Sequence, residues 1–290
     1  MSLETAENVG RHIDTCPVGC AASLEPTALV LPEGPLLQCT ACAQLVSQVS
    51  AARYWEAMQA FDEPQFNQPT PREAARRVSV AQRRLKRIAA LLGQSPAASR
   101  LIDVGCSRGH FVAAAGSLGF KAEGVEPAPH IAAAARDTGL VVHQGLLEDL
   151  RLPDASFDAV TLFEVIEHLQ APIPLLRECA RILKPGGILC ITTGNAASWT
   201  VAFVGARWDY FHIEKDAGHV SFFNPASLAL LAQRGGFRPE RIETARVKFF
   251  DKGEVGRVRY TLGKFAAELM NLPARLAGRG HDMIAYLRRS

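Results

Sequence analysis

Between residues 100 and 194 short apolar runs alternate with amphipathic segments, and this alternation constrains the fold more than any other feature of the chain. Strands separated by helices are expected to pair in parallel through right-handed crossovers. Two more strand-like runs follow the alternating region. The sequence therefore predicts an α/β fold with a doubly wound sheet. The predicted strands are 101–104, 122–125, 140–143, 157–163, 188–192, 237–244 and 246–250.

A glycine-rich turn joins the first predicted strand to the helix after it, in the sequence Leu-Ile-Asp-Val-Gly-Cys-Ser-Arg-Gly-His-Phe of residues 101–111. At the carboxyl edge of a parallel sheet such a turn lets a ligand approach the backbone. A dinucleotide fingerprint needs glycine at its first, third and sixth positions. Those positions hold Gly105, Ser107 and His110. Because two of the three glycines are missing, the turn is not predicted to bind a nicotinamide dinucleotide.

The same turn resembles motif I of the class I S-adenosylmethionine (SAM) methyltransferases, where an acid is followed by alternating glycines. Asp103, Gly105 and Gly109 match that motif, and Ser107 stands where the family has its middle glycine. Glu126 ends the next predicted strand, where the family's carboxylate accepts hydrogen bonds from both ribose hydroxyls. Three further segments, 145–158, 163–169 and 183–189, follow in the family's order. The resemblance covers about residues 98–250 and implies the family's seven-stranded, Rossmann-like methyltransferase sheet.

The resemblance also implies which residues hold SAM. Relatives often have an aspartate for the adenine amino group where this chain has Leu146. Adenine contact is therefore expected from the backbone of Leu147 and from Glu148. The full set of expected cofactor-binding residues is Asp103, Gly105, Ser107, Gly109, Glu126, Pro127, Leu147, Glu148 and Phe163.

Within this class the chain is most similar to the ubiquinone-type O-methyltransferases and their relatives in small-molecule and glycan pathways. Enzymes that methylate amino groups of nucleic acids usually carry Asn/Asp-Pro-Pro-aromatic after the fourth strand, and this chain has Phe-Glu-Val-Ile there, at 163–166. The implied function is O-methylation of a hydroxyl on a small-molecule or glycan intermediate. One alternative is an RNA methyltransferase that docks through an N-terminal zinc module and a basic helix. Another is a SAM-binding regulator without catalytic activity.

Four residues are candidates for the chemistry: Glu164, Glu167 and His168 after the fourth strand, and His219 in a segment expected to cap the pocket. A hydroxyl acceptor must lose its proton, and His or Glu is the usual base. If 164–168 is helical, its three candidates lie on one face. With His219 they resemble the metal-binding set of the small-RNA 2′-O-methyltransferases, in which a divalent ion replaces a dedicated base. We favour the simpler interpretation, a histidine base without a metal. The candidate pocket walls are Trp199, Trp208, Tyr210, Phe211 and His212.

Four of the seven cysteines, Cys16, Cys20, Cys39 and Cys42, cluster near the N-terminus. Two Cys-bearing turns in this layout are typical of a zinc ribbon with four thiolate ligands. A module of 50 residues buries too little apolar surface to fold alone, so zinc would supply much of its folding free energy. We predict one structural zinc, with four incidental reduced thiols as the alternative. The catalytic domain is expected to keep its fold without this module.

The formal net charge of +3 is small but unevenly distributed. Residues 71–92 carry seven cations and one acid, and residues 254–290 carry seven cations and three acids. With Leu262, Phe265 and Leu269 at helical spacing, the second region is predicted to be a helical tail. It could contact an anionic membrane surface, or pack on the domain as amphipathic helices usually do. Within this tail Pro273 is expected to interrupt the helix.

These features divide the chain into four predicted parts. They are a zinc-ribbon-like module at 1–50, a linker and basic helix at 51–97, a methyltransferase domain at 98–252 with a cap insertion at 196–222, and a basic helical tail at 253–290. No apolar run approaches the ~18 residues that span a bilayer. No signal peptide is visible, so a cytoplasmic location is expected.

Overall fold

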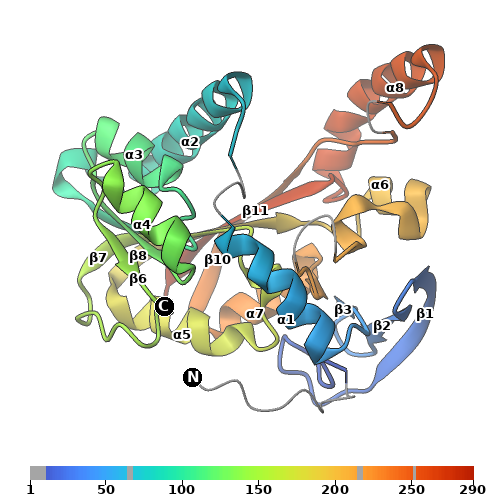
Figure 1. The fold of residues 1–290 in the computed structure, drawn as a ribbon, viewed down its shortest axis with the longest axis horizontal. Coiled ribbons are helices and arrows are strands. Elements are labelled where there is room, and N and C mark those ends of the chain that lie inside the picture. The colour runs from blue at the N-terminus through green and yellow to red at the C-terminus, as the bar shows by residue number, and fades with distance from the viewer. Residues whose placement is uncertain (1–10, 64–67, 214–217, 251–252) are drawn as a thin grey trace.

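A seven-stranded sheet forms the centre of the computed structural model, which describes residues 11–63, 68–213, 218–250 and 253–290 (Figure 1). The five strands β8, β7, β4, β5 and β6 run parallel, and the chain winds outward from β4 in both directions. The predicted α/β, doubly wound fold is therefore confirmed. In spatial order the strands are β10 (Phe237–Ala245), β11 (Asp282–Arg289), β8 (Leu183–Gly194), β7 (Phe157–Phe163), β4 (Arg100–Val104), β5 (Lys121–Glu126) and β6 (Val142–Gln144).

Helices cover both faces of this sheet. One face packs against α5 (Pro172–Ile182) and α7 (Pro225–Arg234), whose apolar sides join the largest core cluster. The other face packs against α2 (Pro71–Leu92), α3 (His110–Ser117) and α4 (Pro129–Asp137). A short 3₁₀ turn, η2 (Pro96–Ala98), leads from α2 into β4.

The basic helix α2 belongs to the body of the fold. Thr70 and Glu73 form a capping box at its start, and Gly93 ends it in a left-handed conformation with φ +67°. Leu85 and Ile88 are fully buried against the sheet, while the cations lie mainly on the outer side. The predicted basic helix is therefore present, but it packs in the core of the sheet domain instead of preceding that domain as a separate part.

The predicted helical tail also contains a strand. After α8 (Arg257–Leu276) the chain returns as β11, which lies antiparallel between β8 and β10. This strand is the seventh of the sheet; residues 246–250, which were expected to be that strand, have no regular structure. Pro273 does not interrupt α8: its carbonyl still accepts a hydrogen bond from the Ala277 N–H at 2.9 Å, and the helix continues to Leu276.

The N-terminal module and the cap form one unit instead of two. Strand β9 of the cap (Ser221–Phe222) pairs with β3 of the module (Leu45–Val46) and completes a four-stranded sheet with β2 (Gly34–Cys39) and β1 (Leu24–Leu31). The remainder of the described cap consists of α6 (Trp199–Val204) and two 3₁₀ turns, η4 (Gly205–Arg207) and η5 (Asp209–Phe211).

The module also shares the main core, because Cys16, Val18 and Cys39 lie in the same apolar cluster as residues of α5, α7 and the large sheet. The Arg234 guanidinium donates to the Val18 carbonyl at 2.5 Å, and the Asn224 amide donates to the Ala43 carbonyl at 3.1 Å. The module and the catalytic domain therefore share one core, so loss of the module is expected to destabilise that domain.

Residues 51–62, expected to be linker, form α1 (Ala51–Gln59) and the 3₁₀ turn η1 (Ala60–Asp62). The Asp62 carboxylate accepts a hydrogen bond at 2.8 Å from the backbone N–H of His130, in the first turn of α4. The Tyr54 hydroxyl donates to the His168 carbonyl at 2.8 Å. This segment therefore bridges two regions of the structure that are far apart in sequence and carry predicted site residues.

Helix α8 projects from the body of the molecule (Figure 1). Among the residues that the structure describes, no helix combines the length and the apolar character needed to cross a membrane.

Candidate functional site

The glycine turn after β4 has the geometry of a backbone cradle. Gly105 and Gly109 have φ values of +75° and +74°, a region that side chains rarely adopt. A Cβ atom at Gly105 would lie 2.6 Å from a methyl carbon of Val165, and one at Gly109 would lie 2.4 Å from a methyl carbon of Leu140. Both positions therefore require glycine. Ser107 also has a positive φ, +48°, which explains why the family uses glycine there.

Glu126 ties this turn to the end of β5. Its carboxylate accepts hydrogen bonds from the backbone N–H groups of Ser107 at 2.8 Å and Ala128 at 3.0 Å. Burial raises the pKa of Glu126, and the neighbouring Asp62 carboxylate contributes in the same direction. Each carboxylate oxygen has a second lone pair, so Glu126 can still accept hydrogen bonds from a ligand's hydroxyl groups.

Asp103 lies beneath the turn, in β4, and is almost completely buried. The Thr161 hydroxyl of the neighbouring strand β7 donates to its carboxylate at 2.6 Å. Burial raises the pKa of Asp103 to about 7. The folded protein therefore holds a proton on this group at pH values where the unfolded chain, with an ordinary aspartate pKa near ~4, has released it.

This shift predicts a pH-dependent stability. Because the pKa is raised on folding, stability is expected to fall as pH rises from about 4 to 7, and the full penalty remains above pH 7. Asp103→Asn removes the titration and keeps an acceptor for Thr161. It should therefore raise the free energy of unfolding at pH 8 by about 2–4 kcal/mol, at ~1.4 kcal/mol per pKa unit.

Urea unfolding of wild type and variant at pH 4 and pH 8 measures this difference directly. The two proteins should be nearly equally stable at pH 4. An equal stability difference at both pH values would contradict the raised pKa.

The other expected cofactor-binding residues line the same edge of the sheet. Leu147 buries its side chain in the main core, so only its backbone can face a ligand there, whereas Pro127 and Glu148 are exposed. Phe163 is half-buried, with its ring edge-on to Phe111 at 4.6 Å.

A second, polar cluster follows β7 and contains the four candidate catalytic residues. Glu164 has a left-handed backbone, and a single 3₁₀ turn, η3 (Ile166–His168), begins two residues later. The segment is therefore not an α-helix, as the metal-site hypothesis assumed. The fold still brings potential ligand atoms of Glu167, His168 and His219 within 4.8 Å of one another, and all three side chains are buried. Glu164 does not belong to this group of three.

Tyr210, from the cap, lies at the centre of the cluster. Its hydroxyl oxygen lies 3.0 Å from Glu164 Oε2, makes a very short contact with Glu167 Oε1 and lies 3.0 Å from the Thr193 hydroxyl. A hydroxyl has one proton to donate, so both carboxylate contacts are hydrogen bonds only if one carboxylate is protonated. Burial and the charge of Glu164 raise the pKa of Glu167 well above its ordinary value, which favours Glu167 over Glu164 as the group that holds the proton.

His219 is held in one tautomer. Its Nδ1 lies 3.2 Å from the Tyr210 carbonyl, which can only accept, so Nδ1 carries the proton and Nε2 keeps its lone pair. Burial, together with the nearby His168, lowers the pKa of His219 well below its ordinary value. His219 is therefore a neutral imidazole at pH 7, with Nε2 3.9 Å from Glu167 Oε1.

Sequence patterns did not reveal several residues of this region. Tyr210 was expected only as a wall, and Tyr54, Phe61 and Asp62 were assigned to a linker. The Phe61 ring lies edge-on to the His168 ring at 5.2 Å, while Asp62 lies beside the Glu126 side of the site. Trp208 stacks on Tyr210 at 4.9 Å, but Trp199 lies elsewhere, in a cavity between α6 and α8.

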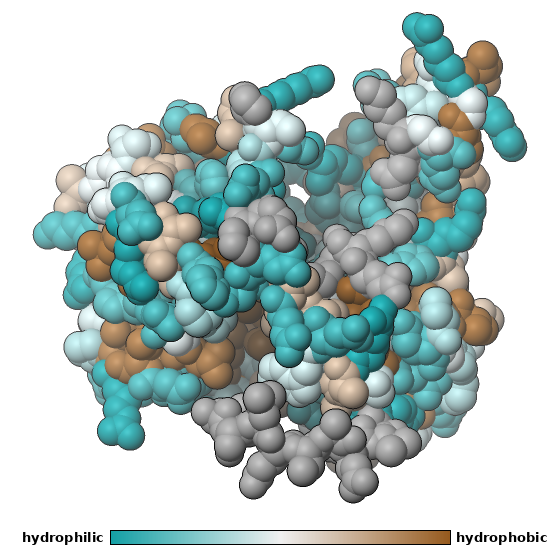
Figure 2. Space-filling model, viewed as in Figure 1, coloured by the Kyte–Doolittle hydropathy of each residue, from teal (hydrophilic) through white to brown (hydrophobic). Residues whose placement is uncertain are grey.

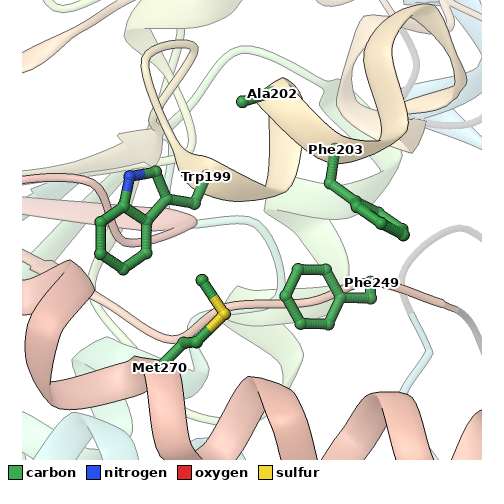
Figure 3. A pocket seen from close by; sticks show the side chains of 5 residues that line it. All are labelled: Trp199, Ala202, Phe203, Phe249 and Met270. Carbon is green, nitrogen blue, oxygen red and sulfur yellow. The ribbon is translucent and has the colours of Figure 1, made fainter.

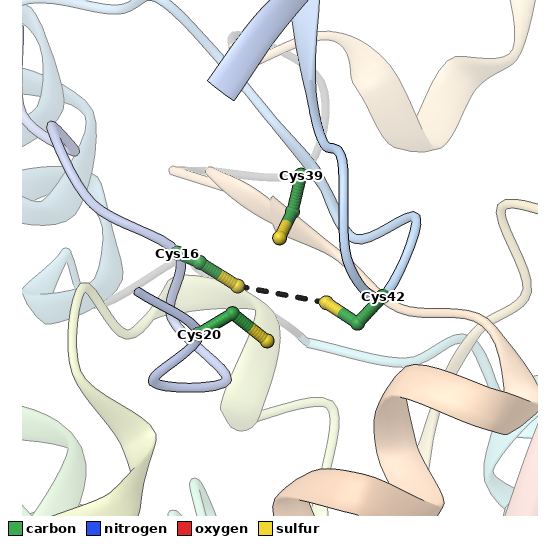
Figure 4. Close-up of side chains that lie close together, drawn as sticks. All are labelled: Cys16, Cys20, Cys39 and Cys42. Atoms are coloured by element: carbon green, nitrogen blue, oxygen red, sulfur yellow. Dashed lines mark hydrogen bonds between the residues drawn. The ribbon is translucent and has the colours of Figure 1, made fainter. Parts of the chain in front are cut away.

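The four N-terminal cysteines form a second candidate site, a metal centre (Figure 4). Their sulfur atoms all lie within 4.8 Å of one another, and Cys16 Sγ lies 3.6 Å from Cys42 Sγ. Tetrahedral zinc with Zn–S bonds of about 2.3 Å separates its sulfur ligands by about 3.8 Å. The cysteines are free thiols, so the four residues fit a zinc ion without a disulfide competing for them.

Comparison with known proteins agrees with this geometry. A family model described as a methyltransferase domain matches residues 72–242. The chain is 35% identical over 169 residues to a ubiquinone biosynthesis O-methyltransferase of Xanthomonas axonopodis pv. citri, covering 55% of this chain and 70% of that protein. It is 33% identical over 156 residues to the protein of the same name from Xanthomonas euvesicatoria pv. vesicatoria, covering 50% and 65%.

Solved structures show the same fold at low sequence identity. A SAM-dependent methyltransferase from Archaeoglobus fulgidus superposes with a TM-score of 0.52 at 20% identity, covering 73% of this chain and 94% of that one. A putative sarcosine dimethylglycine methyltransferase from Galdieria sulphuraria has a TM-score of 0.52 at 18% identity, with coverage of 79% and 91%.

Proposed function

Because the chain belongs to the SAM-dependent methyltransferases, we propose that it transfers the methyl group of SAM to a hydroxyl oxygen of a small-molecule or glycan acceptor. The observation that carries this proposal is the cluster of the buried side chains Glu167, His168 and His219, with the Tyr210 hydroxyl in contact with Glu167. It supplies a neutral histidine beside polar groups, as removal of a hydroxyl proton requires. The O-methyltransferase relatives support the same chemistry.

The cofactor half of the site is formed by the glycine turn and Glu126. We propose that Gly105, Ser107 and Gly109 present backbone to the amino acid part of SAM and that Glu126 accepts hydrogen bonds from its ribose hydroxyls. Asp103 supports the turn from below. The fixed positive φ values and the Ser107–Glu126 hydrogen bond support a preformed site. Pro127, the Leu147 backbone, Glu148 and Phe163 complete the proposed contacts.

Glu126→Ala tests the ribose assignment. The change leaves two ribose hydroxyls unpaired and removes the acceptor of the Ser107 and Ala128 backbone N–H groups, at a cost of about 1–3 kcal/mol. Calorimetric titration with S-adenosylhomocysteine should show affinity reduced by about 5- to 150-fold. Glu148→Ala, at an exposed position on the adenine side, serves as the comparison and should have a smaller effect. Unchanged affinity in Glu126→Ala would contradict the assignment.

In the acceptor half, we propose His219 Nε2 as the base that takes the acceptor proton while the hydroxyl oxygen attacks the SAM methyl group. Methyl transfer from a sulfonium is a direct displacement, so orientation of acceptor and donor supplies much of the rate. His168, Glu164 and Tyr210 lie around the same position and support an orienting role.

A divalent metal at this position is the alternative, since Glu167, His168 and His219 offer one carboxylate and two imidazoles within 4.8 Å. Glu167 Oε2 is buried and has no hydrogen-bond partner among the described residues, so the set fits a cation. Such a metal would lower the pKa of a bound acceptor hydroxyl. In that case His219 would hold the ion instead of accepting the proton.

We propose one structural zinc at Cys16, Cys20, Cys39 and Cys42. The sulfur geometry supports it. The Arg234 guanidinium, 3.5 Å from Cys20 Sγ, would offset part of the thiolate charge.

The acceptor class can be found with methyl-labelled SAM. The purified protein is incubated with fractions of small molecules, lipids, glycans and RNA from its host, and the fraction that takes up label is identified. Alkali-stable label on a hydroxyl of a small molecule or glycan is the expected result. Label in RNA alone, or on nitrogen or carbon, would contradict the proposal.

A further inference from the structure

Helix α8 has two apolar stripes on different sides. The inner stripe consists of small or flexible residues, with Ala267 and Ala274 buried and Met270 partly buried. At Gly263, a Cβ atom would lie 2.7 Å from the Phe250 ring. This stripe packs on the segment that follows β10, so it already has a partner within the protein.

The outer stripe has no such cover among the residues that the structure describes. Its six side chains are large and between 62% and 80% exposed. They follow one another at intervals of four and three residues, which places them along one side of the helix. Figure 2 shows hydrophobic and hydrophilic side chains next to each other on this projecting part of the molecule. The stripe consists of Val258, Leu262, Phe265, Leu269, Leu272 and Leu276.

Cations surround this stripe. The helix carries Arg257, Arg259, Lys264 and Arg275 against one acid, Glu268, and Arg279 follows shortly after its end. All five cationic residues are exposed. Long Arg and Lys side chains can keep their charged ends in a polar layer while their stems cover apolar surface.

The net charge of α8 indicates which of two partners, a second copy of the chain or a lipid surface, covers the outer stripe. A second copy of this chain would bring two helices of net charge +3 side by side, with only one acid on each to compensate. An anionic lipid surface complements both features, because it attracts the cations and accepts the apolar side chains at its headgroup boundary. A separate apolar opening lies on the inner side of α8, at Met270 of the inner stripe. A cavity of about 410 Å³ between α6 and α8 is lined by Trp199, Ala202, Phe203, Phe249 and Met270 (Figure 3).

We propose that α8 docks the protein on an anionic lipid bilayer, with the outer stripe in the interface and the cations among the lipid headgroups. The interaction is peripheral and goes beyond the methyl transfer proposed above. The other basic helix, α2, lacks an exposed apolar stripe over residues 72–92. It carries seven cations but exposes only one large apolar side chain, Val78, among the residues of the helix that can be assessed.

Flotation of the full-length protein with lipid vesicles tests the proposal. Wild-type protein should bind vesicles of phosphatidylcholine mixed with phosphatidylglycerol at least tenfold more tightly than vesicles of phosphatidylcholine alone. Leu262→Asn with Leu269→Asn should weaken binding to the mixed vesicles at least tenfold. Arg257→Gln with Arg259→Gln and Lys264→Gln should do the same, and the residual binding should depend less on salt.

The matched control changes the same number of cations on the other basic helix, as Arg72→Gln, Arg76→Gln and Arg83→Gln. All three are exposed, and binding should change less than twofold. Thermal midpoints of all variants should match wild type, because the substituted side chains lie in solvent. Three outcomes would overturn the proposal: no preference for anionic vesicles, equal loss in the α2 control, or a wild-type dimer by light scattering that Leu262→Asn with Leu269→Asn dissociates.

Discussion

His219→Ala is expected to lower kcat by between about 100-fold and 10,000-fold, the usual contribution of a positioned general base. The reason is the fixed tautomer, in which the Tyr210 carbonyl holds the Nδ1 proton and leaves Nε2 able to accept. Alanine removes the acceptor nitrogen without touching the glycine turn. Binding of S-adenosylhomocysteine should therefore stay within about twofold of wild type, which separates a chemical defect from loss of the cofactor site.

Turnover of the acceptor identified by methyl labelling measures this effect. His143→Ala is the control, because His143 lies in β6 and pairs with Glu123 at 2.9 Å, outside the polar cluster. Its kcat should remain near wild type. Wild-type turnover by His219→Ala would exclude His219 from the chemistry.

Chelation then distinguishes a mechanism with a histidine base from one assisted by a metal. With a base alone, wild-type enzyme keeps full activity in excess EDTA during an assay short enough to retain structural zinc, as elemental analysis of the same sample verifies. If Glu167, His168 and His219 hold a divalent ion, EDTA should abolish turnover and Mg²⁺ or Mn²⁺ should restore it. Glu167→Gln should then raise the metal concentration needed for half-maximal activity.

The second large effect is expected from Cys39→Ser. This change should remove zinc and lower the thermal midpoint of the whole described body by about 10–20 °C. This decrease in thermal midpoint corresponds to a loss of ~5 kcal/mol in the free energy of unfolding of a domain of this size. That loss is well below the free energy of zinc binding in small zinc peptides, ~10–16 kcal/mol. The effect should spread because Cys39 belongs to the main core cluster and β3 pairs with β9 of the cap.

Calorimetry and elemental analysis of protein purified without added metal measure the two parts of this prediction. Cys190→Ala provides a control, since Cys190 is buried in the large sheet, away from the four N-terminal cysteines. Its replacement should leave one zinc per chain. Wild-type protein with intact thiols but no zinc would contradict the metal centre. A separate early transition that leaves the main one unchanged would contradict its integration into the core.

Sequence patterns were sufficient to predict the part of the fold in which segments close together in the sequence pack against one another. The strands β4, β5 and β7 and the turn after β4 were predicted because apolar runs, glycines and Glu126 mark them locally. Strand β11 was missed because it follows a helix within a basic segment and its partners β8 and β10 precede that helix in the sequence.

The same reason limited the prediction of the site. Glu167, His168 and His219 were identified as candidates by residue type, but their geometry depends on how β9 and the cap pack against η3. Nothing in the sequence around Tyr210 distinguishes it from a packing aromatic residue. Only the folded chain brings its hydroxyl between Glu164 and Glu167.

The position of β11 has a consequence for how the protein is made. This strand pairs with both of its neighbours, β8 and β10, yet it is synthesised after the other six strands of the sheet. Until residue 289 has left the ribosome, both strands present unpaired edges that can pair with other chains. A nascent chain that stalls between α8 and β11 would therefore be prone to aggregation even though its methyltransferase motifs are already complete.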